Sequence, residues 1–259
     1  MSTNDSPSNI TIFRGFPEKG CYTWSPFVTK LESRLRFGDI SYNVDSGSPT
    51  KAPRGKVPYI TFECDGQMQS IADSGLIVHS FVESGYLKDL NAAISPVQKA
   101  QDLAIIALLE NRLYFLQGHE RWIENYYTMR AKILGEMSWP LQIVVGNIIY
   151  NKTVRTMQGQ GTGTFSSEEI ATFRAEIWES LNAILSASYS QHRDSESPFW
   201  LWGGDAPTEA DTVVFGFIIS GLICTAGPMT RQVLDGYPTL VAYARRIHDE
   251  YFPDYKIWE

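Results

Sequence analysis

The fold is decided by one stretch in the first third of the chain, KVPYITFECDGQMQSIADSGLIV, which spans residues 56–78. Residues 57–62 predict a strand that begins with a proline, a position where a strand tolerates proline because no ladder hydrogen bond is lost. Asp65-Gly66 predicts a hairpin turn into a further strand over residues 67–71. Asp73-Ser74 then predicts the N-terminal cap of a helix. The stretch therefore predicts strand, hairpin, strand and helix in close succession.

The residues before this stretch complete the pattern of an α/β domain. Residues 10–13 alternate apolar and polar side chains as a strand does, and Ser25-Pro26 predicts a helix with serine as N-cap and proline in the first turn. Gly38 predicts the end of that helix. Because a strand over residues 40–44 follows, the order is β-α-β and then β-β-α. We expect an α/β domain over residues 10–88, after a disordered N-terminus over residues 1–9.

From residue 95 onward the pattern is helical. The expected helices share start signals and apolar periodicity, and they cover residues 95–123, 125–156, 166–189, 207 onward and 238–252. Pro140 falls inside the second of these helices and predicts a kink there. Ser166 and Glu169 have the spacing of a capping box. The chain therefore divides into an α/β domain and an all-α domain over residues 95–259.

Composition excludes several functional classes. The chain has 259 residues, of which 43% are hydrophobic and 20% charged, and these are values of a globular protein. Its net charge of -7 argues against a nucleic-acid partner, which requires a basic surface. Three widely spaced cysteines suit a reducing compartment, and no metal-ligand spacing is present. With neither a signal sequence nor a membrane-spanning run in the pattern, we expect a cytoplasmic protein without membrane contact.

Four short motifs, in this order and at these distances, resemble the glutathione transferase superfamily across nearly the whole chain. They are Lys56-Val57-Pro58, Asp73-Ser74, Gly204-Asp205-x-Pro207-Thr208-x-Ala210-Asp211 and Tyr237-Pro238-x-Leu240. The resemblance implies the glutathione transferase fold, in which an N-terminal thioredoxin-like domain is followed by a C-terminal helical bundle. It also implies glutathione as co-substrate, no metal, and a cis peptide bond before Pro58.

A finer resemblance is to the failed-axon-connections and metaxin-like branch, of fungal or bacterial type. The segment Ser25-Pro26-Phe27-x-x-Lys30-Leu31-Glu32-x-x-Leu35-Arg36 follows the first helix of that branch. Two departures stand out. Val28 occupies a position where the branch often has cysteine, which removes a redox partner. The retained Asp73-Ser74 pair, which the branch often lacks, favours glutathione binding.

Ser25 is the candidate catalytic residue. A helix N-terminus favours a negative charge, and a hydroxyl that donates to the sulfur favours the thiolate further. Ser25 stands where relatives with a Cys-Pro-Phe helix have their first cysteine, so mixed-disulfide chemistry is not available at this position. The alternative is that Ser25 only caps the helix. Cys21 and Tyr22, in the preceding loop, are the other two candidates; Cys21 is alternatively an apolar filler.

The resemblance assigns the binding of glutathione to five residues. Val57, set by cis Pro58, presents its backbone N–H and C=O to the extended tripeptide, which pairs as an added strand. Lys56 pairs with a glutathione carboxylate, and Asp73 and Ser74 meet the γ-glutamyl group. The alternative for Lys56 is a solvated loop lysine, and for Asp73 and Ser74 simple capping of the helix.

An acceptor pocket is expected near an aromatic cluster of the helical domain, formed by Trp122, Tyr126 and Tyr127 together with Met129. Core packing or a dimer surface is the competing interpretation of these side chains. The acceptor would be a small hydrophobic electrophile. The sequence leaves a homodimer open.

Three functions compete at this point. The first is a glutathione-dependent transferase or a related isomerase, lyase or peroxidase, acting in detoxification or secondary metabolism with a hydroxyl-stabilised thiolate. The second is a non-catalytic ligand-binding protein of the same fold. The third is a metaxin-like adaptor. Lys56-Val57-Pro58 and Asp73-Ser74 favour the first two.

Overall fold

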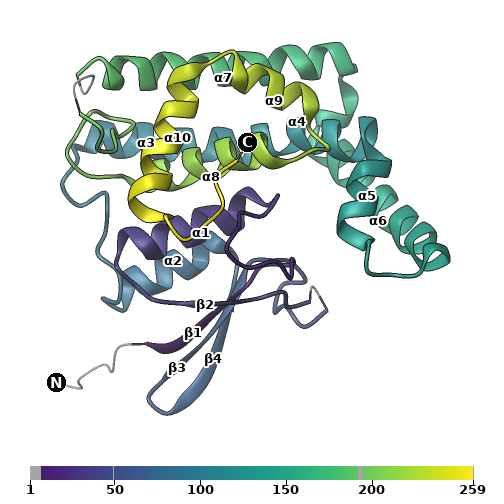
Figure 1. The fold of residues 1–259 in the computed structure, drawn as a ribbon, viewed down its shortest axis with the longest axis horizontal. Helices are drawn as coiled ribbons and strands as arrows, with labels where there is room; N and C mark the ends of the chain where they lie inside the picture. The colour runs from purple at the N-terminus through teal and green to yellow at the C-terminus, as the bar shows by residue number, and fades with distance from the viewer. Residues whose placement is uncertain (1–6, 49, 192–194, 259) are drawn as a thin grey trace.

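The computed structural model describes residues 7–48, 50–191 and 195–258. A four-stranded sheet lies at one end of the molecule, the long helices lie at the other, and α1 and α2 lie between them (Figure 1). The strand order is β2 (Asn43–Asp45), β1 (Ser8–Phe13), β3 (Tyr59–Cys64) and β4 (Gln67–Ala72). β1 is parallel to β2, whereas the β1–β3 and β3–β4 pairs are antiparallel.

The strands differ slightly from the sequence prediction. β1 begins at Ser8, so Ser8 and Asn9 belong to the sheet, while residues 1–6 of the expected N-terminal tail lie outside the described residues. β2 is shorter than residues 40–44 and begins later, because Ile40 and Tyr42 pack against the apolar core of the α/β domain instead of pairing with β1. The predicted Asp65-Gly66 turn is confirmed, with φ of 51° and 69°.

Two helices cover one face of the sheet. α1 (Pro26–Phe37) begins after Ser25 and ends at Gly38, and α2 (Ser74–Glu83) begins after Asp73, all as predicted. The alternation of β1 and β3 turns one apolar row of each strand toward these helices. The resulting core is formed by side chains from all four elements: Ile10, Ile12, Leu31, Leu35, Ile60, Phe62, Ile77, Val78 and Phe81.

The remaining chain is all-helical. Its elements are α3 (Pro96–Leu108), η1 (Leu109–Leu113), α4 (Tyr114–His119), η2 (Glu120–Glu124), α5 (Tyr126–Leu134), α6 (Trp139–Gln160), η3 (Thr162–Thr164), α7 (Ser167–Tyr189), α8 (Glu209–Ile223), α9 (Pro228–Asp235) and α10 (Pro238–Tyr251). η1 and η2 are single π-helical turns that interrupt the run from α3 to α5. α8 is buried along most of its length and forms the centre of this domain.

The sequence prediction was wrong about one long helix. A single helix over residues 125–156 with a kink at Pro140 was expected, but α5 ends at Leu134 and α6 begins at Trp139. Pro140 lies in the first turn of α6. An N–H group in a first turn has no carbonyl partner within the helix, so a proline, which lacks this group, is tolerated there. α6 also extends to Gln160 and ends at Gly161, and α9 was not anticipated.

The two domains meet at α1. Gly216 of α8 faces the start of α1 so closely that an added Cβ would lie 2.5 Å from the carbonyl oxygen of Pro26. Ion pairs join the same helix to the rest of the chain: Lys30 to Glu110 of η1, Glu32 to Arg14, and Arg34 to Glu209 of α8. The helical domain therefore fixes the position of the α1 N-terminus.

Candidate functional site

One end of the sheet gathers most of the residues that the sequence predicts as functional. Phe13, Tyr59 and Ala72 lie in one row across β1, β3 and β4. The loop to α1 follows Phe13, Val57-Pro58 precedes Tyr59, and Asp73 follows Ala72 directly. Since these segments all leave or enter the sheet at the same end, the α1 loop, Val57 and Asp73 are neighbours.

Contacts at this end tie the three segments together. The Asp73 N–H donates to the carbonyl oxygen of Pro58 at 3.3 Å. Gly15, in the α1 loop, lies against Val57, because a Cβ added to the glycine would be 3.0 Å from a methyl group of Val57. The Val57–Pro58 bond is cis, as predicted. Among the described residues, the N–H and C=O of Val57 have no hydrogen-bond partner.

Ser25 occupies the N-cap of α1 but makes no capping bond with its side chain. Its carbonyl oxygen accepts from the Thr29 N–H at 3.4 Å and from the Thr23 hydroxyl at 3.5 Å, so the first turn of α1 forms without the Ser25 side chain. The hydroxyl of Ser25 is half-exposed and has no partner among the residues that the structure describes. A free hydroxyl thus lies beside the unpaired N–H groups of a helix start, an arrangement that favours an anion.

Asp73 and Ser74 begin α2 in an unusual backbone geometry. Asp73 has a φ of 83°, and its Oδ1 accepts from the N–H groups of Gly75 at 3.0 Å and Leu76 at 3.3 Å. Its side chain is therefore a real cap, but Oδ2 makes none of these bonds and Asp73 is exposed. Ser74 is buried, and its hydroxyl has no hydrogen bond to another described residue.

Cations surround this end of the sheet. Lys56 is exposed in the loop before β3, as are Lys51 and Arg54, and within the described parts of the chain none of the three forms an ion pair. Lys30 of α1 approaches α2, because its Nζ lies 3.9 Å from the position of a Cβ added to Gly75. Lys30 also pairs with Glu110 at 2.6 Å. The exposed cations of the loop before β3 are therefore the positive charges at this end that no described acidic side chain neutralises, whereas Glu110 neutralises Lys30.

Tyr22 is placed away from this arrangement. Its hydroxyl is 2.8 Å from Nδ1 of His248 on α10, and its ring packs against Phe215, Phe252 and Tyr255. Burial raises the pKa of the Tyr22 phenol far above its ordinary value. The Tyr22 hydroxyl is thus occupied in the interdomain core and does not face the start of α1.

Cys21 lines a small cavity of about 70 Å³, together with Arg14, Phe16, Glu18, Tyr22, Thr23, Trp24 and Lys132. Thr23 and Trp24 are the two residues before Ser25, so the cavity adjoins the start of α1. Cys21 is half-buried, and its carbonyl oxygen accepts from the buried Arg14 guanidinium. Of the two alternatives to Ser25, Cys21 is the one that the structure leaves near the candidate site.

The aromatic group expected to form an acceptor pocket is divided between two places. Trp122 packs with Trp24, Met129 and Cys224, beside the residue that precedes Ser25. Tyr126 and Tyr127 lie farther along, at the start of α5, where they contact each other and Tyr126 contacts Tyr150 of α6. Only Trp122 of the three therefore lies next to the α1 loop.

Two residues that the sequence did not single out hold the backbone directly before Ser25. Nη1 of Arg121 donates to the carbonyl oxygen of Trp24 at 3.1 Å, and the hydroxyl of Ser220 donates to the same oxygen at 2.6 Å. Arg121 is buried in the π-turn η2, and its Nη2 also reaches the Ser220 hydroxyl at 3.0 Å. In the sequence Arg121 is one charged residue in a long helix, and nothing there signals this contact.

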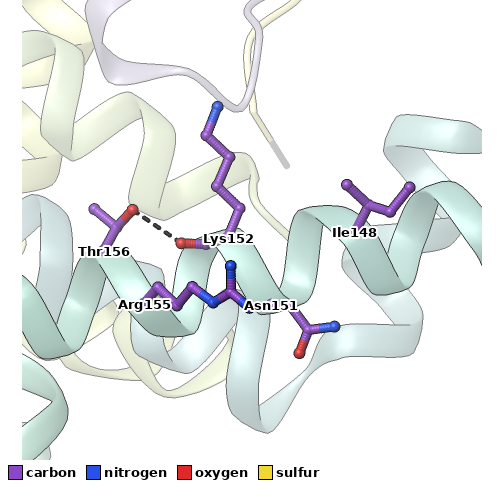
Figure 2. A pocket seen from close by; sticks show the side chains of 5 residues that line it. All are labelled: Ile148, Asn151, Lys152, Arg155 and Thr156. Carbon is purple, nitrogen blue, oxygen red and sulfur yellow. Dashed lines mark hydrogen bonds between the residues drawn. The ribbon is translucent and has the colours of Figure 1, made fainter.

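A larger, open hollow of about 610 Å³ lies along α6 (Figure 2) and is lined by Ile148, Asn151, Lys152, Arg155 and Thr156. It contains none of the residues expected to bind glutathione. Across the described residues, no group of His, Cys, Asp and Glu side chains is arranged to hold a metal ion. No single described helix is long and apolar enough to cross a membrane; α8 and α9, bent by 114°, meet the length and composition only as a pair.

The fold and the geometry of the candidate site together define a structural class of protein. A thioredoxin-like domain, with a cis proline before β3 and two helix N-termini at one sheet end, is followed by an all-helical domain. Residues 26–129 match the family model described as the glutathione S-transferase N-terminal domain. Among solved structures, beta-etherase LigF from Sphingobium sp. strain SYK-6 covers 94% of this chain at a TM-score of 0.59 and 17% identity, with 96% of its own chain covered.

Relatives identified by sequence lead to the same family. The chain is 28% identical to the isoprene-epoxide–glutathione S-transferase of Rhodococcus sp. (strain AD45), over 93% of this chain and 99% of that protein. It is 27% identical to failed axon connections of Drosophila melanogaster over 89% of this chain, but spans 55% of that protein's length. Metaxin-2 of Mus musculus is 25% identical, over 79% of this chain and 73% of its own length. These findings support placing the chain in the glutathione transferase superfamily, in a branch that resembles failed axon connections and the metaxins.

A solved glutathione transferase homologue from Lodderomyces elongisporus, with two GSH per subunit, has the same fold at a TM-score of 0.54 and 15% identity, covering 95% of this chain and 97% of its own. At this identity the likeness shows the fold alone. The role of each residue in the present chain therefore depends on its own geometry.

Proposed function

We propose that the protein binds glutathione at the end of the sheet where α1 and α2 begin, and that it joins the glutathione thiolate, with the whole tripeptide still attached, to a small hydrophobic electrophile. One observation carries this proposal: the hydroxyl of Ser25 lies at the N-cap of α1 without making a capping bond. It is free to donate to a thiolate, which the N–H groups of the helix start also favour.

The ligand would be held in three places. The backbone of Val57 would pair with the cysteinyl part of glutathione as an added strand, because both of its polar groups lack a partner among the described residues. Oδ2 of Asp73 would accept from the γ-glutamyl ammonium group, and Ser74 with the α2 N-terminus would bind the adjacent carboxylate. Lys56 would meet the remaining carboxylate.

The acceptor would lie beside Trp122 and Cys21, the two candidates that the structure leaves near the start of α1. We place the protein in the cytoplasm, since all three of its cysteines are free. Detoxification or secondary metabolism is the matching role, and the Rhodococcus relative, which is named for an epoxide and glutathione, supports this reaction class.

Glutathione binding is tested by calorimetry on the combined change Asp73→Ala and Ser74→Ala. We expect a large loss of affinity, because both groups that would bind the γ-glutamyl end are removed. Ser166→Ala is the matched control, since Ser166 caps α7 in the same way but far along the chain. Unchanged affinity in the double variant would place the ligand elsewhere.

The catalytic role of Ser25 is tested by titrating the thiol of bound glutathione through its thiolate absorbance. One charge-assisted hydrogen bond is worth about 1.5–3 kcal/mol, so Ser25→Ala should raise the pKa of the bound thiol by about one to two units. Stability should change little, because the Ser25 side chain does not cap α1. An unchanged thiol pKa would assign the role to another residue, and Cys21→Ser would be the next variant.

A non-catalytic adaptor is the second candidate function. The relatives named failed axon connections and metaxin support it, and so do the exposed apolar residues Leu141, Val144 and Ile148 of α6. An adaptor would keep its assembly behaviour in the Asp73→Ala and Ser74→Ala variant, and wild-type protein would show no thiolate absorbance with glutathione.

A further inference from the structure

Arg121 is a buried cation without a carboxylate partner. Its side chain lies on the π-turn η2 and is 5% exposed, and it forms no ion pair with any residue that the structure describes. Its Nε is buried and makes no hydrogen bond there either. The neighbouring carboxylate is already engaged, because Glu120 pairs with Arg174 at 3.1 Å and accepts from the Met229 N–H at 2.7 Å. A charge removed from water is costly unless it is paired, so Arg121 is a candidate for a functional charge.

The guanidinium of Arg121 is held by three neutral oxygens. Nη1 donates to the carbonyl oxygen of Trp24 at 3.1 Å, and Nη2 donates to the hydroxyl of Ser220 at 3.0 Å and to its carbonyl oxygen at 3.2 Å. The Ser220 hydroxyl in turn donates to the Trp24 carbonyl oxygen at 2.6 Å. Ser220 lies in the last turn of α8, where carbonyl groups carry a partial negative charge. These oxygens orient the cation, but none of them has a formal charge that would neutralise it.

The charge of Arg121 lies beside the N-terminus of α1. Trp24 directly precedes Ser25, so the guanidinium is hydrogen-bonded to the residue next to the N-cap. Trp24 also packs against a cluster that contains the buried Cys224. Burial raises the pKa of the Cys224 thiol, and the Arg121 guanidinium opposes this increase. The cation therefore already favours the ionised form of one sulfur packed against this loop, and the helix N-terminus adds positive potential at the same place.

Other charges around this loop are neutralised within the described residues. Four ion pairs take them up: Arg14 with Glu32, Lys30 with Glu110, Lys132 with Glu18, and His119 with Glu124 of η2 itself. The cations of the loop before β3 are exposed, so water and salt screen them. Arg121 is thus the buried positive charge that remains near the start of α1.

We propose that Arg121 and Ser220 are positioning residues for the bound thiolate. Through the Trp24 carbonyl they fix Ser25 at the start of α1, and the unneutralised charge of Arg121 favours the ionised sulfur over the thiol. The thiol proton leaves to solvent, and neither Arg121 nor Ser220 touches the reacting atoms. This inference rests on the proposed glutathione site and adds to it a source of charge that lies in the helical domain.

The competing explanation is that Arg121 only joins η2, α8 and the loop before α1. The two explanations differ in what they predict for a replacement that keeps the size of the side chain but removes its charge. A buried charge replaced by an apolar group of similar volume often leaves stability unchanged or raised. A structural role therefore predicts an effect on stability alone, whereas a positioning role predicts a change in the ionisation of the bound thiol.

Titration of bound glutathione through its thiolate absorbance tests the proposal. Arg121→Met should raise the pKa of the bound thiol by about one unit or more, because a nearby positive charge is removed. Arg121→Lys and Ser220→Ala both keep a cation at this place, so each should raise the pKa by less than Arg121→Met does. Arg34→Met is the matched control: Arg34 is equally buried but pairs with Glu209, and its loss should lower stability without changing the thiol pKa.

A second measurement needs no glutathione. Amide hydrogen exchange in the free protein should become faster over residues 23–29 in Ser220→Ala and remain unchanged in β3 and β4, because the hydroxyl that holds the Trp24 carbonyl is lost. Unchanged exchange over residues 23–29 would overturn the positioning role.

Calorimetry separates a failure of this proposal from a failure of the glutathione site. Wild type that does not bind glutathione would overturn both. Wild type that binds glutathione, with the same thiol pKa in Arg121→Met, would overturn the role of Arg121 and leave the glutathione site standing. Equal shifts in Arg121→Met and Arg121→Lys would also overturn it, because the charge would then not matter.

Discussion

α1 and α6 reverse the usual relation between polarity and burial. α1 carries Lys30, Glu32 and Arg34 in its interior turns, and all three are buried. α6 carries Leu141, Val144 and Ile148 on a face that is more than half exposed. The polar residues are thus inside and the apolar residues outside.

The difference shows that burial follows from the surfaces that surround a helix rather than from its own residues. α1 lies between the sheet and the helical domain, so every face of it is covered (Figure 1). Each of its buried charges has a partner on another element, at distances from 2.6 Å for Lys30 and Glu110 to 3.4 Å for Glu32 and Arg14. Among the described residues, α6 packs against α5, η2 and η3, and this packing leaves Leu141, Val144 and Ile148 exposed.

The largest effect is expected from breaking a buried ion pair of α1. Nε of Arg34 donates to Glu209 at 2.8 Å, and its Nη2 donates to the carbonyl oxygen of Lys88. Arg34→Ala removes the cation that pairs with the carboxylate of Glu209, which is mostly buried. Removing one partner of a buried ion pair costs about 3–5 kcal/mol of unfolding free energy. Urea denaturation should show this loss in the free energy of unfolding.

The control for Arg34 is an exposed pair. His79 and Glu83 lie 3.2 Å apart on α2, and both side chains are about 70% exposed. Glu83→Gln should leave the free energy of unfolding unchanged within error, since exposed pairs contribute little. Equal losses in Arg34→Ala and Glu83→Gln would show that α1 is not the buried element described above.

The next effect compares two leucines. Leu35 of α1 is fully buried, and Leu35→Ala should cost about 2–5 kcal/mol of unfolding free energy through lost contacts and a cavity. Leu141→Ala on α6 should cost little, because Leu141 is 55% exposed. A large loss of unfolding free energy in Leu141→Ala would mean that the chain itself covers this side chain.

The sequence predicts the order of the elements well where local signals are strong. Ser25-Pro26, Asp73-Ser74 and the Ser166 box all begin helices in the structure, because an N-cap depends on its immediate neighbours. Pro140 was misassigned because a proline in a helical pattern indicates either a kink or a first turn. The choice between a kink and a first turn depends on whether Gly135 ends the preceding helix. The sequence does not decide this, because the residues on both sides of Gly135 are compatible with a helix.

The candidate site was predictable only in part. Ser25, Val57 and Asp73 are recognisable because each lies in a short motif, and the topology of the sheet brings them to one end. Arg121 and Ser220 were not, since they reach the Trp24 carbonyl from helices about one hundred and two hundred residues away along the chain. Tyr22 could be placed only by the structure, because its orientation is set by His248.

The third buried charge of α1 has a pH dependence of its own. Burial raises the pKa of Glu32 to about 6 from 4.5, although the Arg14 guanidinium and the hydrogen bond from Tyr255 oppose the shift. An acid whose pKa is raised by folding stabilises the fold in its protonated form. Its contribution is fully present below pH 4.5 and is lost as the pH rises through 6.

The smallest expected effect is therefore a change with pH in the free energy of unfolding. Between pH 7 and pH 4.5, wild type should gain about 2 kcal/mol of unfolding free energy relative to Glu32→Gln, since a shift of one pKa unit corresponds to 1.36 kcal/mol. The amide cannot ionise but can still accept the Tyr255 hydrogen bond, which is 2.9 Å long in the wild type. Asp254→Asn is a control of opposite sign, because the hydrogen bond from Arg36 lowers the pKa of Asp254. The difference in unfolding free energy between wild type and this variant should therefore stay constant between pH 7 and pH 4.5 and shrink below pH 3.8. Urea denaturation at a series of pH values measures both differences, and a Glu32→Gln difference that does not vary between pH 7 and 4.5 would show that Glu32 is not held in a desolvated site.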